Sequence, residues 1–417
     1  MDRSESTIAT PEVARSDHRT DRLPRPPHLV SRTSAAPSVL RADDHHLLVS
    51  CYFLRSIALE GVGTFVSGLA RALSSTGWQV QLLSPGGLTV DRQRIDERTY
   101  QSGPLGMIRY ASSLRNLSRD ADVVLEIEDN PNMASLTSAS RCRGRTFSYF
   151  NTPLQSWSTM TEMGWSRQAI AHTLAKHPWF SRRFDWSGRR CIVASHFQAD
   201  QLRELGATEV HVLPGGGLSS TKPIPTREEC RAELGWDDRP VVGYLGHYSP
   251  AKGVPVLIDA FERGTGPAVL ALAYSGKGRL PRASETQLAN LRQAGRVREL
   301  GIVDPVQFLG ACDVVVLPFV TSSIHHLPLV MLESFAARTP VIVSQVGGVA
   351  EMITPGMNGD VVPPRDPQAL ADTLQRHLTD LDACHAMGRH ARRLFETELA
   401  NEVFCARLSE IIRKERS

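Results

Sequence analysis

Two charged residues, Lys252 and Glu333, are candidates for ligand contacts, because Lys252 lies in a loop that follows a short apolar segment and Glu333 lies about one turn into a predicted helix. The ammonium group of a lysine is a compact positive charge that suits a diphosphate. The carboxylate of a glutamate does not favour phosphate, but it accepts hydrogen bonds from hydroxyl groups in pairs, as sugars offer them. Lys252 therefore indicates a phosphate contact, and Glu333 indicates a contact with sugar hydroxyls.

The segment around Glu333 has the pattern of a strand, a loop and a helix. Residues 314–317 form an unbroken apolar run, which is typical of a strand buried in a parallel sheet. A helix is predicted over 329–337, opening at Pro328, and a second strand is predicted over 341–343. This order indicates a parallel crossover unit, and the ligands of such sheets bind beyond the carboxyl ends of the strands.

The start of that helix is a candidate anion site. The backbone N–H groups of Leu329, Val330 and Met331 have no partners further back in the helix, and the positive end of the helix dipole lies behind them. They follow the polar loop of residues 321–326, which is expected at the carboxyl end of the preceding strand. These donors therefore predict a phosphate-binding site.

The loop that carries Lys252 begins with Gly246, directly after a predicted strand over 241–245, and leads into a helix over 254–262. Glycine lets the backbone approach a ligand closely, and His247 adds a second, pH-dependent cation. An ordinary tight turn is the alternative interpretation of this loop taken alone. The order of this loop and the helix start at Pro328 along the chain favours a binding role for both.

A glycine pair, Gly61 and Gly63, follows a predicted strand over 47–53 and precedes a predicted helix over 64–74. The pair is interpreted as a loop whose backbone can approach a ligand. A tight turn without a ligand is again the alternative.

The alternation of strands and helices divides the chain into two α/β halves. The other segments predicted in the first half are strands over 78–83, 123–126, 146–150, 191–194 and 210–213 and a helix over 197–205. In the second half they are a strand over 268–273 and helices over 367–378 and 399–413. Glycine and proline from residue 215 to 226 predict a linker. We therefore expect one domain over 43–222, a second over 223–395, and a terminal helical segment over 396–417.

The first residues differ from the rest in composition. Residues 1–42 hold seven arginines, five acidic residues and five prolines with few residues that could form a core, so a disordered extension is predicted. The start does not have the pattern of a secretory signal.

Charge and cysteine content limit the classes of partner and location. The 417 residues carry 47 Lys and Arg against 44 Asp and Glu, and this net charge of +3 gives no argument for nucleic acid. Apolar runs are too short for a transmembrane segment, which leaves peripheral membrane contact open. The seven cysteines are scattered and form no Cys-x-x-Cys pair, so free thiols and a cytoplasmic location are expected, without a metal site.

Residues 318–351 resemble the signature of the family 4 glycosyltransferases, retaining enzymes of the GT-B fold, in which two Rossmann-like domains face each other across a cleft. Glu333 matches the second glutamate of this signature, and residues 338–342 and 347–351 match the turn and the Gly-Gly-x-x-Glu tail that follow it. His325 stands in place of the first glutamate. The resemblance covers about residues 47–395.

Two loops match the family with one change each. Lys252 matches the lysine of the loop after residue 245, but His247 stands where arginine is usual. Glu60 stands where the loop of Gly61 and Gly63 commonly has another glycine.

The resemblance implies a hexosyl transfer from a nucleoside diphosphate sugar, with UDP expected, to an acceptor hydroxyl, with retention and without a metal ion. Lys252, His247 and the amides of residues 329–331 would stabilise the leaving diphosphate. Glu333 would hold the ribose, and His325 would contact the sugar or its phosphate. The sugar nucleotide is a co-substrate, and no further cofactor is implied. The terminal helix is expected to return to the first domain.

Two alternatives remain open at this point. The first is a nucleotide-sugar epimerase or hydrolase of the same fold. The second is a non-catalytic partner subunit that binds sugar nucleotides, which the histidines at 247 and 325 favour. The acceptor is expected to bind the first domain, where Asn151 stands near the position of a family histidine. Four tryptophans there could line the acceptor site or fill the core: Trp157, Trp165, Trp179 and Trp186.

Overall fold

The structure of the protein is a computed structural model. The residues it describes are 45–51, 61–86, 88, 95–100, 106–128, 145–150, 152, 154, 177, 181–221, 223–248, 250–274, 279–321 and 328–414. The predicted extension over 1–42 lies outside them. In this described part, no helix is long and apolar enough to cross a membrane.

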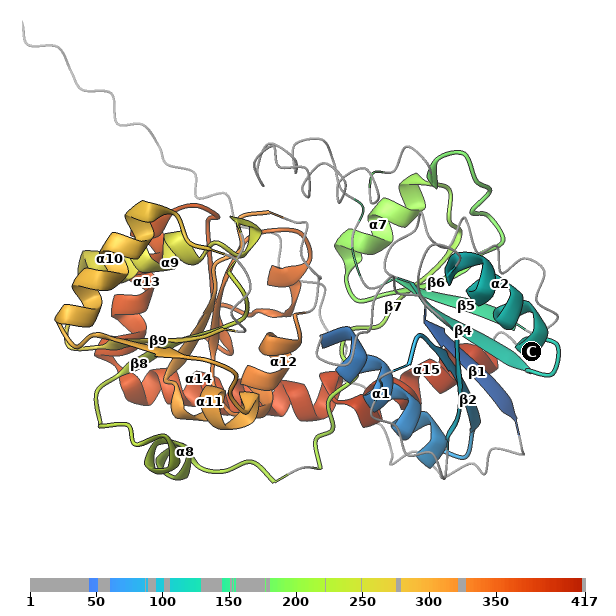
Figure 1. The fold of residues 1–417 in the computed structure, drawn as a ribbon, viewed down its shortest axis with the longest axis horizontal. Coiled ribbons are helices and arrows are strands. Elements are labelled where there is room, and N and C mark those ends of the chain that lie inside the picture. Colours follow the sequence, from blue (N-terminus) through green and yellow to red (C-terminus); the bar gives the residue numbers. More distant parts are fainter. Residues whose placement is uncertain are drawn as a thin grey trace, which may run out of the picture. The chain divides into compact units, whose positions relative to one another are not determined.

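The first half of the chain forms a parallel sheet (Figure 1). Seven strands belong to it within the described ranges: β1 (His46–Cys51), β2 (Gln79–Ser84), β3 (Ile95–Thr99), β4 (Val123–Glu128), β5 (Arg145–Phe150), β6 (Arg190–Val193) and β7 (Glu209–Val212). Their spatial order is β3-β2-β1-β4-β5-β6-β7. The order reverses direction between β1 and β4, and ligands of such sheets bind near this switch point.

Helices cover both faces of this sheet. Helix α1 (Gly61–Ser75) buries Phe65, Leu69 and Leu73 at helical spacing against strand residues such as Val49. Helix α2 (Gly106–Leu117) buries its own apolar side chains against strand residues of the opposite face, such as Leu48. A third helix, α7 (His196–Glu204), follows β6. The alternation of strand residues between two cores explains why a central strand such as β1 is buried along nearly its whole length.

The second half forms another parallel sheet, with six strands among the described residues. They are β8 (Val241–Leu245), β9 (Val269–Ala273), β10 (Val297–Leu300), β11 (Val314–Leu317), β12 (Val341–Ser344) and β13 (Gly359–Val362). Their order is β10-β9-β8-β11-β12-β13, so β8 and β11 flank the switch point. The loops after these two strands are therefore the expected place for a ligand.

Seven helices surround the second sheet in the described part: α8 (Arg227–Leu234), α9 (Val254–Gly264), α10 (Arg282–Gln293), α11 (Pro305–Ala311), α12 (Leu329–Ala336), α13 (Pro367–Thr379) and α14 (Leu381–Leu394). Val315 and Leu317 of β11 share a core with α11 and α12. Val314 and Val316 point the other way and share a core with α9, α10 and α13. Each residue of β11 is thus buried under helices on one face or the other.

The chain crosses between the two sheets at two packed places. Gly215, Gly216 and Gly217 all have positive φ, and a Cβ on Gly215 would lie 2.3 Å from the carbonyl oxygen of Leu399. The terminal helix α15 (Asn401–Lys414) packs against α1, where Asn401 Nδ2 donates to Gly68 O at 2.7 Å. The domain limits predicted from the sequence stay predictions.

Most predicted segments agree with the structure, and one prediction is wrong. Gly61 and Gly63 do not form a loop before a helix, because α1 already begins at Gly61. Several elements were not predicted from the sequence, namely β3, α2, α8, α10, β10, α11, β13 and α14.

Candidate functional site

The loop after β8 is built to place Lys252. Gly246 has a φ of 157°, and its N–H donates to Ala273 O at 3.0 Å, which ties the loop to the end of β9. A short 3-10 turn, η2 (Pro250–Lys252), follows, and Gly253 has a φ of 67°. A Cβ at residue 253 would lie 1.7 Å from Pro318 O, so only glycine fits where this loop meets the end of β11.

Lys252 lies where the loops after β8 and β11 meet. Its Nζ lies over the Phe319 ring, 4.8 Å from the centroid, and Val320 N donates to Ala251 O at 3.1 Å beside it. Burial lowers the pKa of the ammonium group to about 8. Among the described residues, Lys252 has no hydrogen-bond or ion-pair partner. Lys252 is half-buried, and a desolvated cation without an anion costs stability, which favours a ligand as its partner.

Helix α12 begins at Leu329, as predicted, with Pro328 at the N-cap and no side-chain cap. The Met331 N–H donates to Pro328 O at 2.9 Å, so the prediction that it is available to a ligand is wrong. A tight first turn of this kind satisfies one of the amides that a helix start leaves open. The amides of Leu329 and Val330 remain the predicted donors.

Glu333 lies on α12 with 8% of its surface exposed. Burial, and to a smaller extent the nearby charge of Asp304, raises the pKa of its carboxyl group to about 7. Its side chain makes no hydrogen bond or ion pair with the residues that the structure describes. The carboxyl group is therefore a second ionisable group that has no partner among the described residues.

The structure describes only some of the remaining predicted site residues. His247 is exposed, and its carbonyl oxygen accepts a hydrogen bond of 2.9 Å from the Tyr244 hydroxyl group. His325 and Asn151 lie outside the described residues, as do three of the four tryptophans. The fourth, Trp186, is 1% exposed and donates to Ser181 O at 2.8 Å, so it fills the core.

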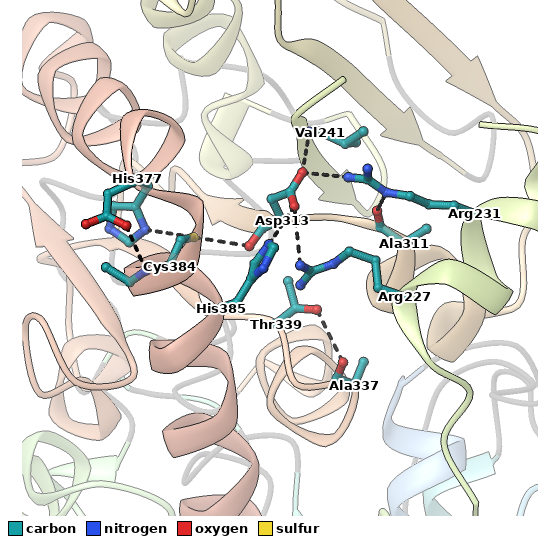
Figure 2. Close-up of polar contacts among 12 residues, drawn as sticks. Arg227, Arg231, Val241, Ala311, Asp313, Ala337, Thr339, His377, Cys384 and His385 are labelled. Carbon is teal, nitrogen blue, oxygen red and sulfur yellow. Dashed lines mark hydrogen bonds and ion pairs between the residues drawn. The ribbon is translucent and has the colours of Figure 1, made fainter. Parts of the chain in front are cut away.

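A second polar cluster, which was not predicted from the sequence, lies at the opposite edge of the same sheet (Figure 2). Asp313, directly before β11, is 1% exposed. Its carboxylate accepts from Arg231 at 2.7 Å and from the Val241 N–H at 2.7 Å, and it lies 2.9 Å from His385 Nε2 and 3.4 Å from Arg227. Burial opposes ionisation, but these partners hold the pKa of Asp313 below its ordinary value.

The cluster around Asp313 extends to a buried histidine. His377 Nε2 lies 2.8 Å from Asp360 Oδ2, and its Nδ1 lies 3.5 Å from Cys384 Sγ. This arrangement resembles a Cys-His-Asp triad, but burial raises the pKa of the Cys384 thiol to about 12 and leaves it 0% exposed. The thiol is therefore a packing group and not a nucleophile.

The described residues contain no group of three or more His, Cys, Asp or Glu that could hold a metal ion.

The candidate site consists of Lys252, Glu333 and the first amides of α12, around the switch point between β8 and β11.

Two family models match the chain. The model "Glycosyl transferases group 1" matches residues 226–394, and the model "Glycosyl transferase 4-like domain" matches residues 60–216. The first range includes Lys252 and Glu333.

Curated relatives match parts of the chain. It is 30% identical over 239 residues to alpha-D-kanosaminyltransferase of Streptomyces kanamyceticus, covering 54% of this chain and 60% of that protein. It is 26% identical over 274 residues to the GDP-mannose-dependent alpha-(1-6)-phosphatidylinositol monomannoside mannosyltransferase of Mycobacterium tuberculosis, covering 60% of this chain and 67% of that protein. The chain thus spans about three fifths to two thirds of the length of these relatives.

A solved structure matches nearly the whole chain. Sucrose-phosphate synthase from Thermosynechococcus elongatus superimposes with a TM-score of 0.71 and 21% identity, covering 89% of this chain and 99% of that one. This likeness concerns the fold, and it confirms the prediction of two parallel α/β sheets in the GT-B arrangement.

Proposed function

Because the chain belongs to the group 1 family of glycosyl transferases, which corresponds to family 4, we propose that it moves a sugar from a nucleoside diphosphate sugar to an acceptor hydroxyl, with retention. The donor we propose is a UDP-sugar, and the sugar itself is left open. The proposal includes a cytoplasmic enzyme that needs no metal ion. The described cysteines are free and buried, which is consistent with a reducing compartment.

The observation that carries the proposal is a pair of ionisable groups at one switch point, the half-buried Lys252 and the buried Glu333, that have no hydrogen-bond or ion-pair partner among the described residues. Lys252 follows β8, and Glu333 lies on the helix that follows β11. Groups of this kind are arranged at functional sites more often than elsewhere, because an unpaired buried charge lowers stability. A diphosphate and a ribose supply the partners that these two groups lack.

In the proposed reaction the bond between the anomeric carbon and the diphosphate breaks, and negative charge develops on the departing oxygen. The Lys252 ammonium and the amides of Leu329 and Val330 stabilise this charge. His247 and His325 are proposed to assist at the diphosphate and at the sugar. Glu333 accepts hydrogen bonds from the ribose hydroxyls and so fixes the nucleoside.

The acceptor hydroxyl attacks the anomeric carbon on the face from which the diphosphate leaves. Its proton passes to the departing diphosphate oxygen, and the new glycosidic bond keeps the anomeric configuration. This route differs from retaining glycoside hydrolysis, in which a second carboxylate forms a covalent intermediate. Exclusion of water from the site favours transfer over hydrolysis.

A panel of nucleotides tests the donor. UDP and GDP are compared by thermal shift, since a ligand that binds the native state raises its melting temperature. UDP is expected to give the larger shift. A larger shift with GDP would mean that the base of the donor is guanine, and the proposed reaction would stay the same. GDP is the matched comparison because the mycobacterial relative is named as GDP-mannose-dependent.

Turnover separates the reaction from its alternatives. Nucleotide-sugars are incubated with and without an acceptor mixture, and release of nucleoside diphosphate is measured. Release that depends on acceptor, and persists with a chelator, supports the proposal. Turnover without acceptor would identify an epimerase or hydrolase, and nucleotide binding without turnover would identify a non-catalytic subunit.

A further inference from the structure

The N-terminus of helix α7 is bound by a side chain from the other half of the chain. His196 N donates to Glu351 Oε2 at 2.7 Å, and Phe197 N donates to Glu351 Oε1 at 2.8 Å. The next amide, of Gln198, donates to the N-cap residue Ser195. Glu351 therefore satisfies two amides that a helix start leaves open, in the favourable field of the helix dipole.

The Glu351 carboxylate is presented by a fixed turn. It belongs to η3 (Val349–Met352), which follows β12, and Glu351 N donates to Gly348 O at 3.2 Å. Val349, in the same turn, is 2% exposed and belongs to the core around α12. The two short bonds are charge-assisted and use both carboxylate oxygens, so the contact has a defined geometry.

Both partners lie at ligand-binding edges. Helix α7 follows β6 of the first sheet, and η3 follows β12 of the second sheet. All strands of both sheets are parallel, so the start of α7 and the turn η3 both lie at carboxyl edges. The contact therefore joins the edge proposed to bind the donor to the edge expected to bind the acceptor.

We propose that Glu351 is a positioning residue for glycosyl transfer, whose carboxylate holds the start of α7 and thereby sets the distance between acceptor and donor. This inference rests on the proposed function. A displacement of about 1 Å between reacting groups is enough to cost on the order of 100-fold in rate. Loss of the contact also admits water, which competes with the acceptor for the same anomeric carbon.

Two variants and one control test the role. Glu351→Ala removes both acceptor oxygens, and Glu351→Gln keeps one. Glu229→Gln is the matched control, because Glu229 also accepts from a backbone N–H at a helix start, that of Thr226 at 2.7 Å, but lies in the capping box of α8. Glu351→Ala is expected to lower kcat for transfer on the order of 10- to 100-fold, with a smaller loss in Glu351→Gln.

The pattern of the loss distinguishes positioning from general damage. Nucleotide Kd and donor KM are expected to change less than about twofold, because Lys252 and Glu333 remain in place. The fraction of donor lost to hydrolysis is expected to rise in the order wild type, Gln, Ala. The Glu229 control is expected to match wild type in kcat and in this fraction.

Hydrogen exchange supplies a readout that does not need activity. A peptide covering residues 195–200 is expected to lose protection in Glu351→Ala and to keep it in the control. Unchanged kcat, hydrolysis fraction and exchange in Glu351→Ala would overturn the inference while leaving the proposed function intact. A wild-type protein that turns over no donor would instead overturn the proposed function and this inference together.

Discussion

The two edges of the second sheet differ in whether their charged side chains have partners within the protein's described residues. At the amino edge, Asp313 has four partners, two of them arginines (Figure 2). At the carboxyl edge, the half-buried Lys252 and the buried Glu333 have no hydrogen-bond or ion-pair partner among the described residues. Both edges belong to one fold, so the difference cannot come from the secondary structure alone.

The comparison distinguishes a carboxylate that stabilises the fold, Asp313, from two groups whose charge a bound ligand would stabilise, Lys252 and Glu333. Partners lower the pKa of Asp313 in spite of burial, whereas burial moves the pKa of Lys252 down to about 8 and that of Glu333 up to about 7. A shift toward the neutral form shows that the protein does not stabilise the charge. Removing charge should therefore have opposite effects on stability at the two edges.

The largest effect is expected from Lys252→Met, which keeps the aliphatic chain and removes the charge. Release of nucleoside diphosphate from the donor should fall on the order of 100- to 1,000-fold, as for the loss of a group that stabilises transition-state charge. The melting temperature without ligand should stay equal or rise, because the substitution removes a desolvated charge that has no partner among the described residues. Initial rates and thermal unfolding measure the two quantities.

Lys414→Met is the control, since Lys414 is exposed and pairs with Glu410 at 2.8 Å. It should leave both rate and melting temperature unchanged. Undiminished turnover in Lys252→Met would remove this lysine from the mechanism.

Asp313→Ala tests the amino edge. It leaves Arg227 and Arg231 buried without their acid, which should cost on the order of 3–5 kcal/mol in free energy of unfolding. Urea unfolding measures this cost, and nucleotide affinity of the folded protein should not change.

Asp237→Ala is the matched control, because Asp237 also pairs with two arginines, Arg239 and Arg298, but is exposed. Exposed pairs contribute about 0–1 kcal/mol. Equal losses in the two variants, or a selective loss of nucleotide affinity in Asp313→Ala, would contradict the distinction between the edges.

Glu333→Gln should stabilise the protein at high pH and weaken nucleotide binding. A carboxyl group with a raised pKa contributes stability that is present below pH 4.5 and is lost as the pH rises through about 7. At pH 8 the substitution should therefore raise the free energy of unfolding by about 3 kcal/mol, and at pH 4.5 it should not.

Urea unfolding at the two pH values checks this difference. Glu262→Gln, which alters an exposed glutamate on α9, should show no such pH dependence. A loss of stability in Glu333→Gln at pH 8 would mean that the carboxylate has a protein partner after all.

The smallest effect is expected in the pH profile of kcat/KM. The rate should rise through about pH 7 as Glu333 ionises and fall above about pH 8 as Lys252 loses its proton. The acidic limb should disappear in Glu333→Gln, at a lower overall rate. Initial rates from pH 5.5 to 9.5 in one buffer mixture measure both limbs, and an unchanged acidic limb in the variant would assign it to another group.

The elements predicted correctly are those whose local residue pattern also matches their place in the fold. The strand at 314–317 and the helix start at Leu329 were predicted because apolar runs and a proline mark them locally. The use of the Met331 amide by Pro328 O was missed, because the tightness of a first turn depends on backbone angles that residue types do not reveal.

Long-range contacts could not be predicted. Asp313 is an acid before a strand, and nothing near it in sequence indicates that Arg227, Arg231 and His385 converge on it from two helices. Glu351 was noticed as part of a signature, but its bond to α7 joins residues 155 positions apart. Short strands with polar residues, such as β3 with Asp96, Glu97 and Arg98, lack the apolar pattern on which strand prediction depends.

The missing Cβ at Gly253 has a consequence for altering the enzyme. Because Pro318 O fills that space, the turn that carries the lysine and the end of β11 cannot shift independently. Moving the cation to suit another leaving group would require rebuilding both segments at once. A designer who wants a new donor preference should therefore leave this junction untouched and vary the side chains that surround it.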